Sequence, residues 1–209
     1  MKITAIHANK YNRDVFSIYI DGLHRLTLSN ELVLELGAKT GQTISEETLL
    51  AWAKKASLSQ AKAAAFNLLS QRMHSRKELE DKLKRKGFPE EAVSRAIERL
   101  DELRMLDDQA YAEALVRSKL NRKAVGAMKL KATLHRKGIN RDIIDSTLNE
   151  VPLYAEELCQ KAAEKKLASL KRESDPIKRR RKLGDYLYRQ GFDWNTISLT
   201  LNRILDEEK

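Results

Sequence analysis

Two adjacent aspartates come closest to a catalytic arrangement in this sequence. Asp107 and Asp108 stand side by side, and paired carboxylates can hold the divalent cations of a metal-dependent nuclease. The alternative is structural: one aspartate caps the helix that begins at Gln109, and the other favours the positive end of that helix dipole. We prefer the structural interpretation, so the pair does not predict an enzyme.

Other catalytic and metal-binding patterns are absent from the sequence. The 8 glycines never form the GxGxxG or GxxxxGK[ST] loops that cradle phosphates. His7, His24, His74 and His135 are scattered, and none has metal-ligand spacing with Cys159. Cys159 is the sole cysteine, which rules out an internal disulfide, and its apolar neighbours favour packing over reactivity. We therefore expect no enzymatic activity, no metal and no cofactor.

The composition excludes several classes of protein. The 209 residues are 42% hydrophobic and 33% charged, with only 8 Gly and 3 Pro. The chain is too apolar to be disordered and too poor in turn-forming residues for an all-β protein of many short strands. No stretch approaches the roughly 18 apolar residues that span a bilayer, and the first residues lack the apolar segment of a signal peptide. We expect a cytoplasmic protein.

Positive charge is concentrated in the later part of the chain. The formal net charge is +10, divided as +1 over residues 1–56, +6 over 57–151 and +3 over 152–209. Residues 114–141 contain no acidic side chain, and residues 178–182 are five consecutive cations. Such stretches favour a polyanionic partner. The predicted DNA-binding or protein-binding surface comprises Arg117, Lys119, Arg122, Lys123, Lys129, Lys131, Arg136, Lys137, Arg141, Lys178, Arg179, Arg180, Arg181 and Lys182.

An ordinary solvated helix face is the competing interpretation of these cations, and we prefer it for residues 76–86, where acids are mixed in. Tyr186 and Tyr188 are the aromatic residues evident on the basic helices, and Trp52 and Trp194 fall on apolar helical faces and are expected in the core. With few stacking platforms, contact with a phosphate backbone is favoured over the reading of bases.

An internal repeat organises the elements that carry these cations. Gly87, Gly138 and Gly191 are spaced by 51 and 53 residues. Each glycine has leucines four and eight residues before it, a large apolar residue directly after it, and further apolar residues at fixed spacings. Leucines four apart form one face of a helix, and a glycine just beyond them can end that helix in a left-handed conformation. Each repeat is therefore predicted to contain a helix, a glycine corner and a second helix.

A further helix precedes each of these pairs. The second residue after each corner glycine is Pro89, Asn140 or Asp193, of which Asn and Asp are good N-caps. The preceding helices are predicted at residues 57–72, where Ser57 and Gln60 have capping-box spacing, 108–122 and 153–171. Three-helix units of this size bury too little apolar surface alone, so we expect them to stack into a curved, elongated array.

The first fifty-odd residues differ from the rest. Apolar and polar residues alternate over 2–29, and Asp21-Gly22 is typical of a tight hairpin turn. Helical periodicity follows from Asn30, and Thr43 with Glu46 has the spacing of a capping box for a helix that runs to residue 56.

The predicted fold is mainly α, with three tandem three-helix repeats after a small N-terminal domain that contains a short antiparallel β-sheet and helices. The predicted domains are the N-terminal domain at 1–56 and the repeats at 57–106, 107–151 and 152–209.

Five short motifs follow one another along the helical part. They are SRKEL at 75–79, KGF at 86–88, LDDQAYA at 106–112, HRKGI at 135–139 and YLYRQGF at 186–192. Their combination and order resemble the RecX family of regulatory proteins, from about residue 57 to the C-terminus, and the strand-rich beginning is like the extension of longer members. Two positions depart from the family pattern: Arg104 and Met105 replace a glycine and an aromatic residue, and Thr133 stands where a glutamate is usual.

The resemblance implies a non-enzymatic regulator of the RecA recombinase. Such proteins lie in the groove of the RecA filament on DNA and restrain its ATP hydrolysis, strand exchange and co-protease activity, which damps recombination, repair and the SOS response. The implied partners are the RecA filament and single- or double-stranded DNA bound without sequence preference. We expect a monomer and no membrane partner.

Two other functions remain open at this level. The repeated units could form a DNA-binding repressor of helix-turn-helix type, whose side chains would read base edges. Alternatively, the chain could be a scaffold for protein interactions whose basic charge is incidental.

Overall fold

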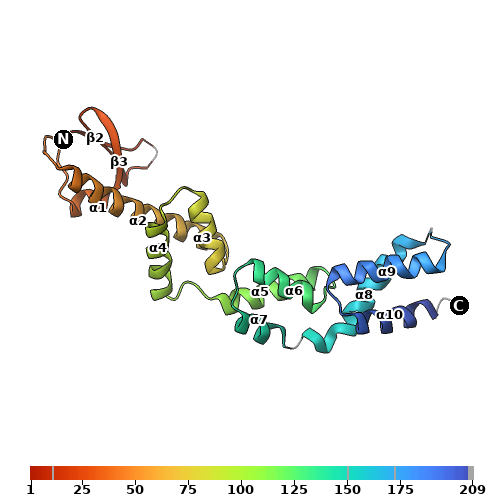
Figure 1. The fold of residues 1–209 in the computed structure, drawn as a ribbon. Coiled ribbons are helices and arrows are strands. Elements are labelled where there is room, and N and C mark those ends of the chain that lie inside the picture. The colour runs from red at the N-terminus through yellow and green to blue at the C-terminus, as the bar shows by residue number, and fades with distance from the viewer. Residues whose placement is uncertain (11, 150, 172, 207–209) are drawn as a thin grey trace. The chain divides into compact units, whose positions relative to one another are not determined.

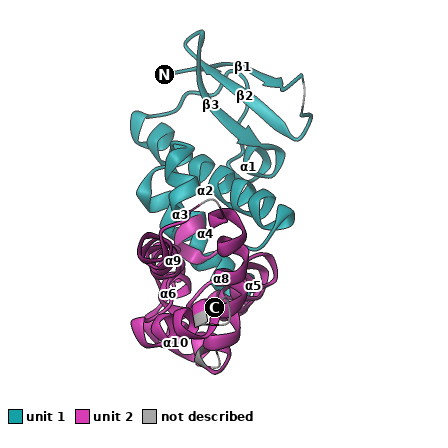
Figure 2. Ribbon diagram, turned by 90° about the vertical axis from the view of Figure 1, so that its right-hand side faces the viewer, with its two compact units in different colours: residues 1–74, 79–106 teal, residues 75–78, 107–209 magenta. Residues whose placement is uncertain are grey.

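The computed structural model describes residues 1–10, 12–149, 151–171 and 173–206. Two compact units divide the chain (Figure 2): unit 1 comprises Met1–His74 and Leu79–Leu106, and unit 2 comprises Ser75–Glu78 and Asp107–Lys209. Residues 150, 172 and 207–209, which the predicted repeats include, lie outside the described residues.

A three-stranded antiparallel sheet opens unit 1 (Figure 1). Its strands β1 (Ile3–Ala8), β2 (Val15–Ile20) and β3 (Leu23–Ser29) pair in the order β1-β2-β3. Asp21 and Gly22 join β2 to β3 with φ angles of 49° and 81°. Two successive positive φ angles match the twist of the flanking strands in a tight hairpin. The predicted sheet and its turn are therefore confirmed.

Helices cover one face of this sheet. The short helix α1 (Asn30–Glu35) follows β3 directly, and α2 (Glu46–Gln71) contacts β3. Ile3, Ile18 and Leu28 are almost completely buried and pack in one cluster with Trp52 of α2. Trp52 is 6% exposed, which confirms its predicted place in the core.

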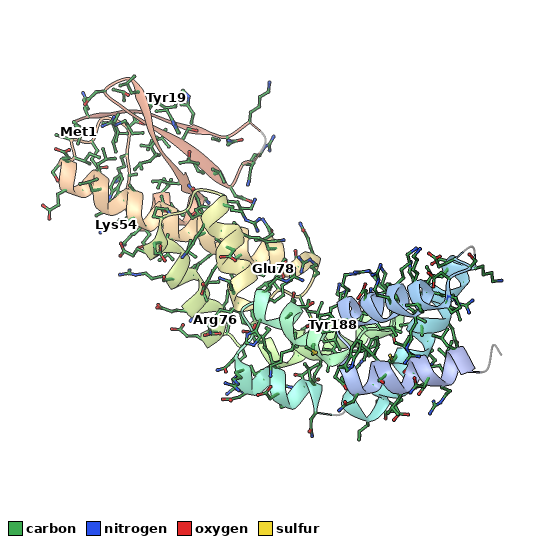
Figure 3. All side chains as sticks on the ribbon, turned by 45° about the vertical axis from the view of Figure 1, so that its right-hand side comes forward. Met1, Tyr19, Lys54, Arg76, Glu78 and Tyr188 are labelled. Atoms are coloured by element: carbon green, nitrogen blue, oxygen red, sulfur yellow. The ribbon has the colours of Figure 1, made fainter. Side chains whose placement is uncertain are left out.

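On the sheet, the Tyr19 ring (Figure 3) lies between two imidazoles. The ring centroids of His7 and His24 lie 5.4 and 5.6 Å from that of Tyr19. Across the described part of the chain, no group of three or more His, Cys, Asp or Glu residues could hold a metal ion.

The two helices predicted at 43–56 and 57–72 are wrong as separate elements. They form the single 26-residue helix α2, with Ser45 as its N-cap accepting a hydrogen bond from the Thr48 amide at 3.0 Å. Ser57 lies inside this helix, so neither Ser57 nor Thr43 acts as the predicted cap. The stretch contains no glycine or proline and many alanines, whose high helix propensity carries the helix through Ser57.

The remaining helices form the three repeats. The first repeat adds α3 (Arg76–Arg85) and α4 (Glu90–Glu102) to the end of α2. The second consists of α5 (Asp108–Arg122), α6 (Ala127–Arg136) and α7 (Arg141–Leu148). The third consists of α8 (Ala155–Leu167), α9 (Pro176–Gln190) and α10 (Trp194–Asp206), with 3-10 turns at Val151–Tyr154 and Ala168–Leu170. The predicted leucine columns are buried, as Leu83, Leu134 and Leu187 illustrate with exposed fractions of 0%.

Capping residues fix the helix starts near the predicted places. Asn140 accepts a hydrogen bond from the Asp142 amide at 3.2 Å, and Asp193 accepts one from the Thr196 amide at 2.9 Å. Pro89 precedes α4 without a side-chain cap, as its lack of a polar side chain requires. These bonds satisfy amides that the helix itself leaves without partners.

The aspartate pair serves structure. Asp107 is the N-cap of α5 and accepts a hydrogen bond from the Ala110 amide at 2.8 Å. Asp108 is the first residue of α5, which matches the predicted range 108–122, and accepts a hydrogen bond from the Arg76 amide at 2.9 Å. Both carboxylates are thus used in holding helix starts, in agreement with the structural interpretation.

The corner glycines have a second role besides ending helices. Gly87, Gly138 and Gly191 have φ angles of 87°, 73° and 90°, as the repeat predicts. In unit 2 a Cβ on Gly138 would collide with the side chain of Lys77, and one on Gly191 would collide with the backbone and Cβ of Lys129. Around Gly87 nothing lies within 4 Å of such a Cβ. Two of the three corners therefore receive the start of another helix at close range.

Backbone hydrogen bonds hold the second of these junctions. The amide of Gly126 donates to the Gln190 carbonyl at 2.9 Å, and the amide of Met128 donates to the Gly191 carbonyl at 3.2 Å. A Cβ on Gly126 would in turn collide with Gly191. The second and third repeats are thus joined through glycine surfaces that leave no room for a side chain.

Trp194 is not a core residue, contrary to the sequence-based expectation. It is 64% exposed, although Ile197 and Leu201, which continue its apolar stripe, are buried. Trp194 occupies the first turn of α10, directly after the corner. At that position the indole is left on the rim of a hollow rather than under a neighbouring helix.

Alanine substitution at the three corners separates the two roles of glycine. Gly87→Ala should cost about 1–2 kcal/mol, because the substitution places a Cβ in left-handed backbone but in open space. Gly138→Ala and Gly191→Ala should each cost roughly 1–3 kcal/mol more, because the neighbouring helix start must also move. Urea unfolding followed by circular dichroism measures these differences, and equal costs at all three corners would contradict the close-approach role.

Candidate binding surface

All fourteen predicted surface cations lie in unit 2, on α5, α6, α7, α9 and the residues that flank them. The structure does not bring them to one face. Lys129 and Lys131, for example, lie on nearly opposite faces of α6, because each residue turns the helix by about 100°. Some of the cations instead form one group around a hollow, which we call the gathered group. Others form ion pairs or hydrogen bonds with acidic or amide side chains of the protein.

The gathered group surrounds a hollow of about 430 Å³, which we call the basic hollow. It is formed by the end of α5 with the following turn, by α8 and by α9. Arg122 and Lys123 line it from the first of these segments, Lys161 and Lys165 from α8, and Tyr186 from α9. Four cations thus converge on one concavity.

Like charges crowd the edge of this hollow. The Nζ atom of Lys129 donates to the Gln190 Oε1 at 2.9 Å, and Gln190 lines the hollow. Burial lowers the pKa of Lys129 below its ordinary value, and the positive charges of Lys123 and Lys119 lower it further. A bound anion would relieve this repulsion, so the electrostatics favour a negatively charged ligand here.

Most of the predicted cations on α5, the following turn and α6 lack acidic partners. Among the residues that the structure describes, no ion pair involves the side chains of Arg117, Lys119, Arg122, Lys123, Lys129 or Arg136. Their charge is therefore available to a partner molecule.

Other predicted cations are engaged within the protein. The Nζ atom of Lys131 lies 2.8 Å from the Asp145 Oδ1, and the Nε atom of Arg141 lies 3.7 Å from its Oδ2. The hydrogen bond from Lys131 lowers the pKa of Asp145, with the charges of Lys131 and Arg141 acting in the same direction. This carboxylate offsets part of the positive charge that the sequence assigns to the surface.

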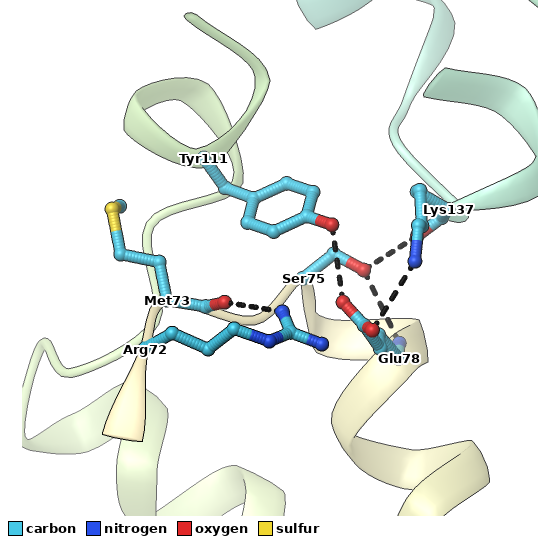
Figure 4. A network of polar contacts seen from close by, with 6 residues as sticks. All are labelled: Arg72, Met73, Ser75, Glu78, Tyr111 and Lys137. Atoms are coloured by element: carbon cyan, nitrogen blue, oxygen red, sulfur yellow. Dashed lines mark hydrogen bonds and ion pairs between the residues drawn. The ribbon is translucent and has the colours of Figure 1, made fainter. Parts of the chain in front are cut away.

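Lys137 belongs to a polar network (Figure 4). Its Nζ atom donates to the Glu78 Oε1 at 3.1 Å, and the Tyr111 hydroxyl donates to the Glu78 Oε2 at 3.1 Å. The Ser75 hydroxyl donates to the Lys137 carbonyl at 2.6 Å. The Glu78 side chain is only 11% exposed. Lys137 therefore compensates a largely buried carboxylate, and its role is structural.

The five consecutive cations of α9 point in different directions, because each residue turns the helix by about 100°. Lys178 pairs with Asp175 at 3.7 Å, and Lys182 pairs with Glu173. Arg179 faces a small hollow that Glu164 and Lys171 also line. Arg180 and Arg181 line the separate hollow beside Trp194.

Sequence reasoning missed Lys161 and Lys165. The two lysines are four residues apart on α8, a spacing that places them on one helix face, and this was the available signal. Lys161 also pairs with Glu157 at 2.5 Å. Their approach to Arg122 and Lys123 depends on how the second and third repeats stack, which the spacing does not reveal.

Other features of the described residues carry no chemistry of this kind. Cys159 is fully buried, and burial raises the pKa of its thiol, so it packs as predicted. Within the described part of the chain, no helix is both long and apolar enough to cross a membrane.

Three stretches of the chain match the family models of RecX. The model of the first three-helix domain matches residues 61–100, that of the second matches 107–148, and that of the third matches 154–201. The chain belongs to the RecX family.

Curated RecX relatives share the sequence over most of its length. Regulatory protein RecX of Chlorobaculum tepidum is 44% identical over 144 residues, which cover 69% of this chain and 88% of that protein. Regulatory protein RecX of Clostridium acetobutylicum is 32% identical over 209 residues, which cover 98% of this chain and 97% of that protein.

Solved RecX structures share the fold. A crystal structure of regulatory protein RecX superposes with a TM-score of 0.70 at 26% identity, covering 95% of this chain and 98% of the other. That of RecX from Lactobacillus salivarius gives a TM-score of 0.59 at 32% identity, covering 72% and 97%. The mainly helical fold with three-helix repeats is thereby confirmed.

One departure from the RecX pattern has a structural consequence. Arg104, which stands where the resemblance leads us to expect glycine, has a φ angle of 53° and follows Leu103, the C-cap of α4. Its left-handed backbone keeps the glycine-type turn, although a side chain disfavours that conformation.

Neutralising Lys123 tests the charge crowding at the basic hollow. In Lys123→Gln the pKa of Lys129 should rise toward its ordinary value, because one of the nearby positive charges is gone. The pKa follows from NMR titration of the lysine side-chain resonances. Lys131→Gln is the control and should leave the Lys129 pKa unchanged. An unchanged Lys129 pKa in Lys123→Gln would contradict the proposed crowding.

Proposed function

We propose that this RecX-family chain binds the RecA filament on DNA and restrains RecA without catalysing a reaction itself. Inhibition of filament ATP hydrolysis, strand exchange and co-protease activity would damp recombination, DNA repair and the SOS response in the cytoplasm. Support for the partner comes from the relatives, which carry the name regulatory protein RecX. Support for the mode of binding comes from the charges of unit 2.

The observation that carries the proposal is the basic hollow. Arg122 and Lys123 extend from the end of one repeat, and Lys161 and Lys165 from the first helix of the next. Lys161 also pairs with Glu157, whereas no ion pair among the described residues involves Arg122 or Lys123. Clustered cations of this kind bind a phosphate backbone by releasing its counterions, whatever the base sequence. The same positive surface would also meet acidic side chains on the protein component of the filament.

A helix-turn-helix repressor receives less support. In that class, residues in the first turn of the helix after the corner reach base edges in the major groove. In this chain α4 begins with Glu90 and Glu91, and the first turn of α7 contains Asp142. Carboxylates at these positions would repel DNA phosphates, so the helices after the first two corners are poorly suited to enter a groove.

The direct test is DNA-dependent ATP hydrolysis by preformed RecA filaments titrated with this protein. We expect dose-dependent inhibition that excess free DNA does not relieve, with serum albumin inert as the control protein. Absence of inhibition, or its complete relief by free DNA, would contradict binding to the filament and leave only competition for DNA.

The salt dependence of binding to duplex DNA tests the role of the basic hollow. If about five cations contact phosphates, a plot of log affinity against log salt should have a slope near −4.5. In the double variant Arg122→Gln/Lys123→Gln the slope should become shallower by about 1.8, since each lost contact removes about 0.9.

Lys131→Gln provides the matched control for that measurement, because Lys131 is already paired with Asp145. Its slope should equal that of the unaltered protein. A double variant with an unaltered slope would place the DNA contact elsewhere.

A further inference from the structure

The exposed Trp194 forms part of a second hollow, between α9 and α10, which we call the aromatic hollow. Its volume is about 300 Å³, at the lower end of the range of pockets that hold small molecules. Trp194 is 64% exposed and Ile177 is 81% exposed, and both line it. Two large, exposed apolar side chains thus line the hollow, Ile177 from the strongly basic helix α9 and Trp194 from α10.

Gly184 keeps this hollow open. It lies buried within α9, where glycine destabilises a helix relative to alanine. A Cβ at Gly184 would meet only the Leu201 Cδ1, at an ordinary distance of 3.5 Å. Packing therefore does not require glycine here, whereas a longer side chain would occupy the space beside Trp194.

The charges around the hollow are mainly positive. Arg180 and Arg181 line it, and Arg180 also donates to the Asn202 Oδ1 at 2.7 Å. Asp185 also lines the hollow. Its carboxylate can accept a hydrogen bond from the N–H groups that every base carries. The site thus combines an aromatic face, cations and a hydrogen-bond acceptor.

We propose that the aromatic hollow binds one unstacked base of single-stranded DNA. The indole of Trp194 stacks on the base, Asp185 accepts a hydrogen bond from the base edge, and Arg180 and Arg181 contact the adjoining phosphates. Stacking on an aromatic side chain tolerates every base, because each has a π face. This inference rests on the proposed function for the identity of the polymer, DNA, and adds a preference for its single-stranded form.

Single-stranded DNA fits this surface better than a peptide segment does. A polymer with one ring and one phosphate per unit matches a site where an exposed ring adjoins consecutive arginines. Tyr188 (Figure 3), four residues beyond Gly184 on the same helix face, is 60% exposed and offers a second ring. An apolar peptide would instead leave the charges of Arg180 and Arg181 without partners.

Tryptophan fluorescence tests the proposal directly. Trp52 and Trp194 are the two tryptophans of the chain, so in Trp52→Phe the emission comes from Trp194 alone. Titration with a thymidylate oligonucleotide of about 16 nucleotides should quench that emission, because a stacked base contacts the indole. A duplex of equal charge should bind with little quenching, because its bases are already stacked.

Affinity measurements on variants give the second readout. Trp194→Ala should weaken binding of the oligonucleotide roughly 5- to 150-fold, the range expected for one stacked base, with duplex affinity unchanged. Gly184→Leu should cause a similar loss with Trp194 still present, because its side chain fills the hollow. Leu199→Ala is the matched control, since Leu199 is a 55% exposed apolar residue of α10 outside the hollow.

Equal affinities of the Trp194→Ala variant and the unaltered protein for the oligonucleotide would overturn the proposal. So would loss of filament inhibition in that variant with oligonucleotide affinity intact, which would make the hollow a docking site for protein. Failure of the proposed function would give a different result. The unaltered protein would then not inhibit RecA, but the free oligonucleotide would still quench the emission of Trp194.

Discussion

The close approach of helix starts to the glycine corners is the constraint on which unit 2 depends. At Gly191 the corner ends α9 in left-handed backbone and also accepts the start of α6, whose amides donate to the Gln190 and Gly191 carbonyls. At Gly138 the first turn of α3 is received in the same way, and the Ser75 hydroxyl donates to the adjacent Lys137 carbonyl. Glycine thus allows both the left-handed backbone that ends one helix and the close approach of the next helix start. A residue with a side chain could not allow both.

This stacking determines which charges meet. The Gly191 junction brings Lys129 of α6 against Gln190 of α9, and the cations at the end of α5 therefore face the lysines of α8. The Gly138 junction has the opposite effect on Lys137, whose amino group is drawn to Glu78. A group of cations around one hollow and a structural ion pair therefore arise from cations that look equivalent in the sequence.

Local features of the fold could be predicted because local physics decides them. The Asp21-Gly22 turn and the Asn140 cap depend on φ preferences and short-range hydrogen bonds that nearby residues reveal. The continuity of α2 was missed, because Ser57 resembles a cap until the helix propensity of its neighbours is weighed. The exposure of Trp194 and the pairing of Lys131 with Asp145 depend on tertiary packing, which periodicity alone does not contain.

Photo-cross-linking from the basic hollow tests the central claim most directly, namely that this surface contacts the RecA–DNA filament. A photoreactive side chain replaces Lys123 in one protein and Lys131, which is already engaged by Asp145, in another, and each is irradiated with preformed filaments. Our account predicts adducts to DNA or RecA from position 123, at much higher yield than from position 131. Equal yields from both positions, or adducts from position 131 alone, would contradict it.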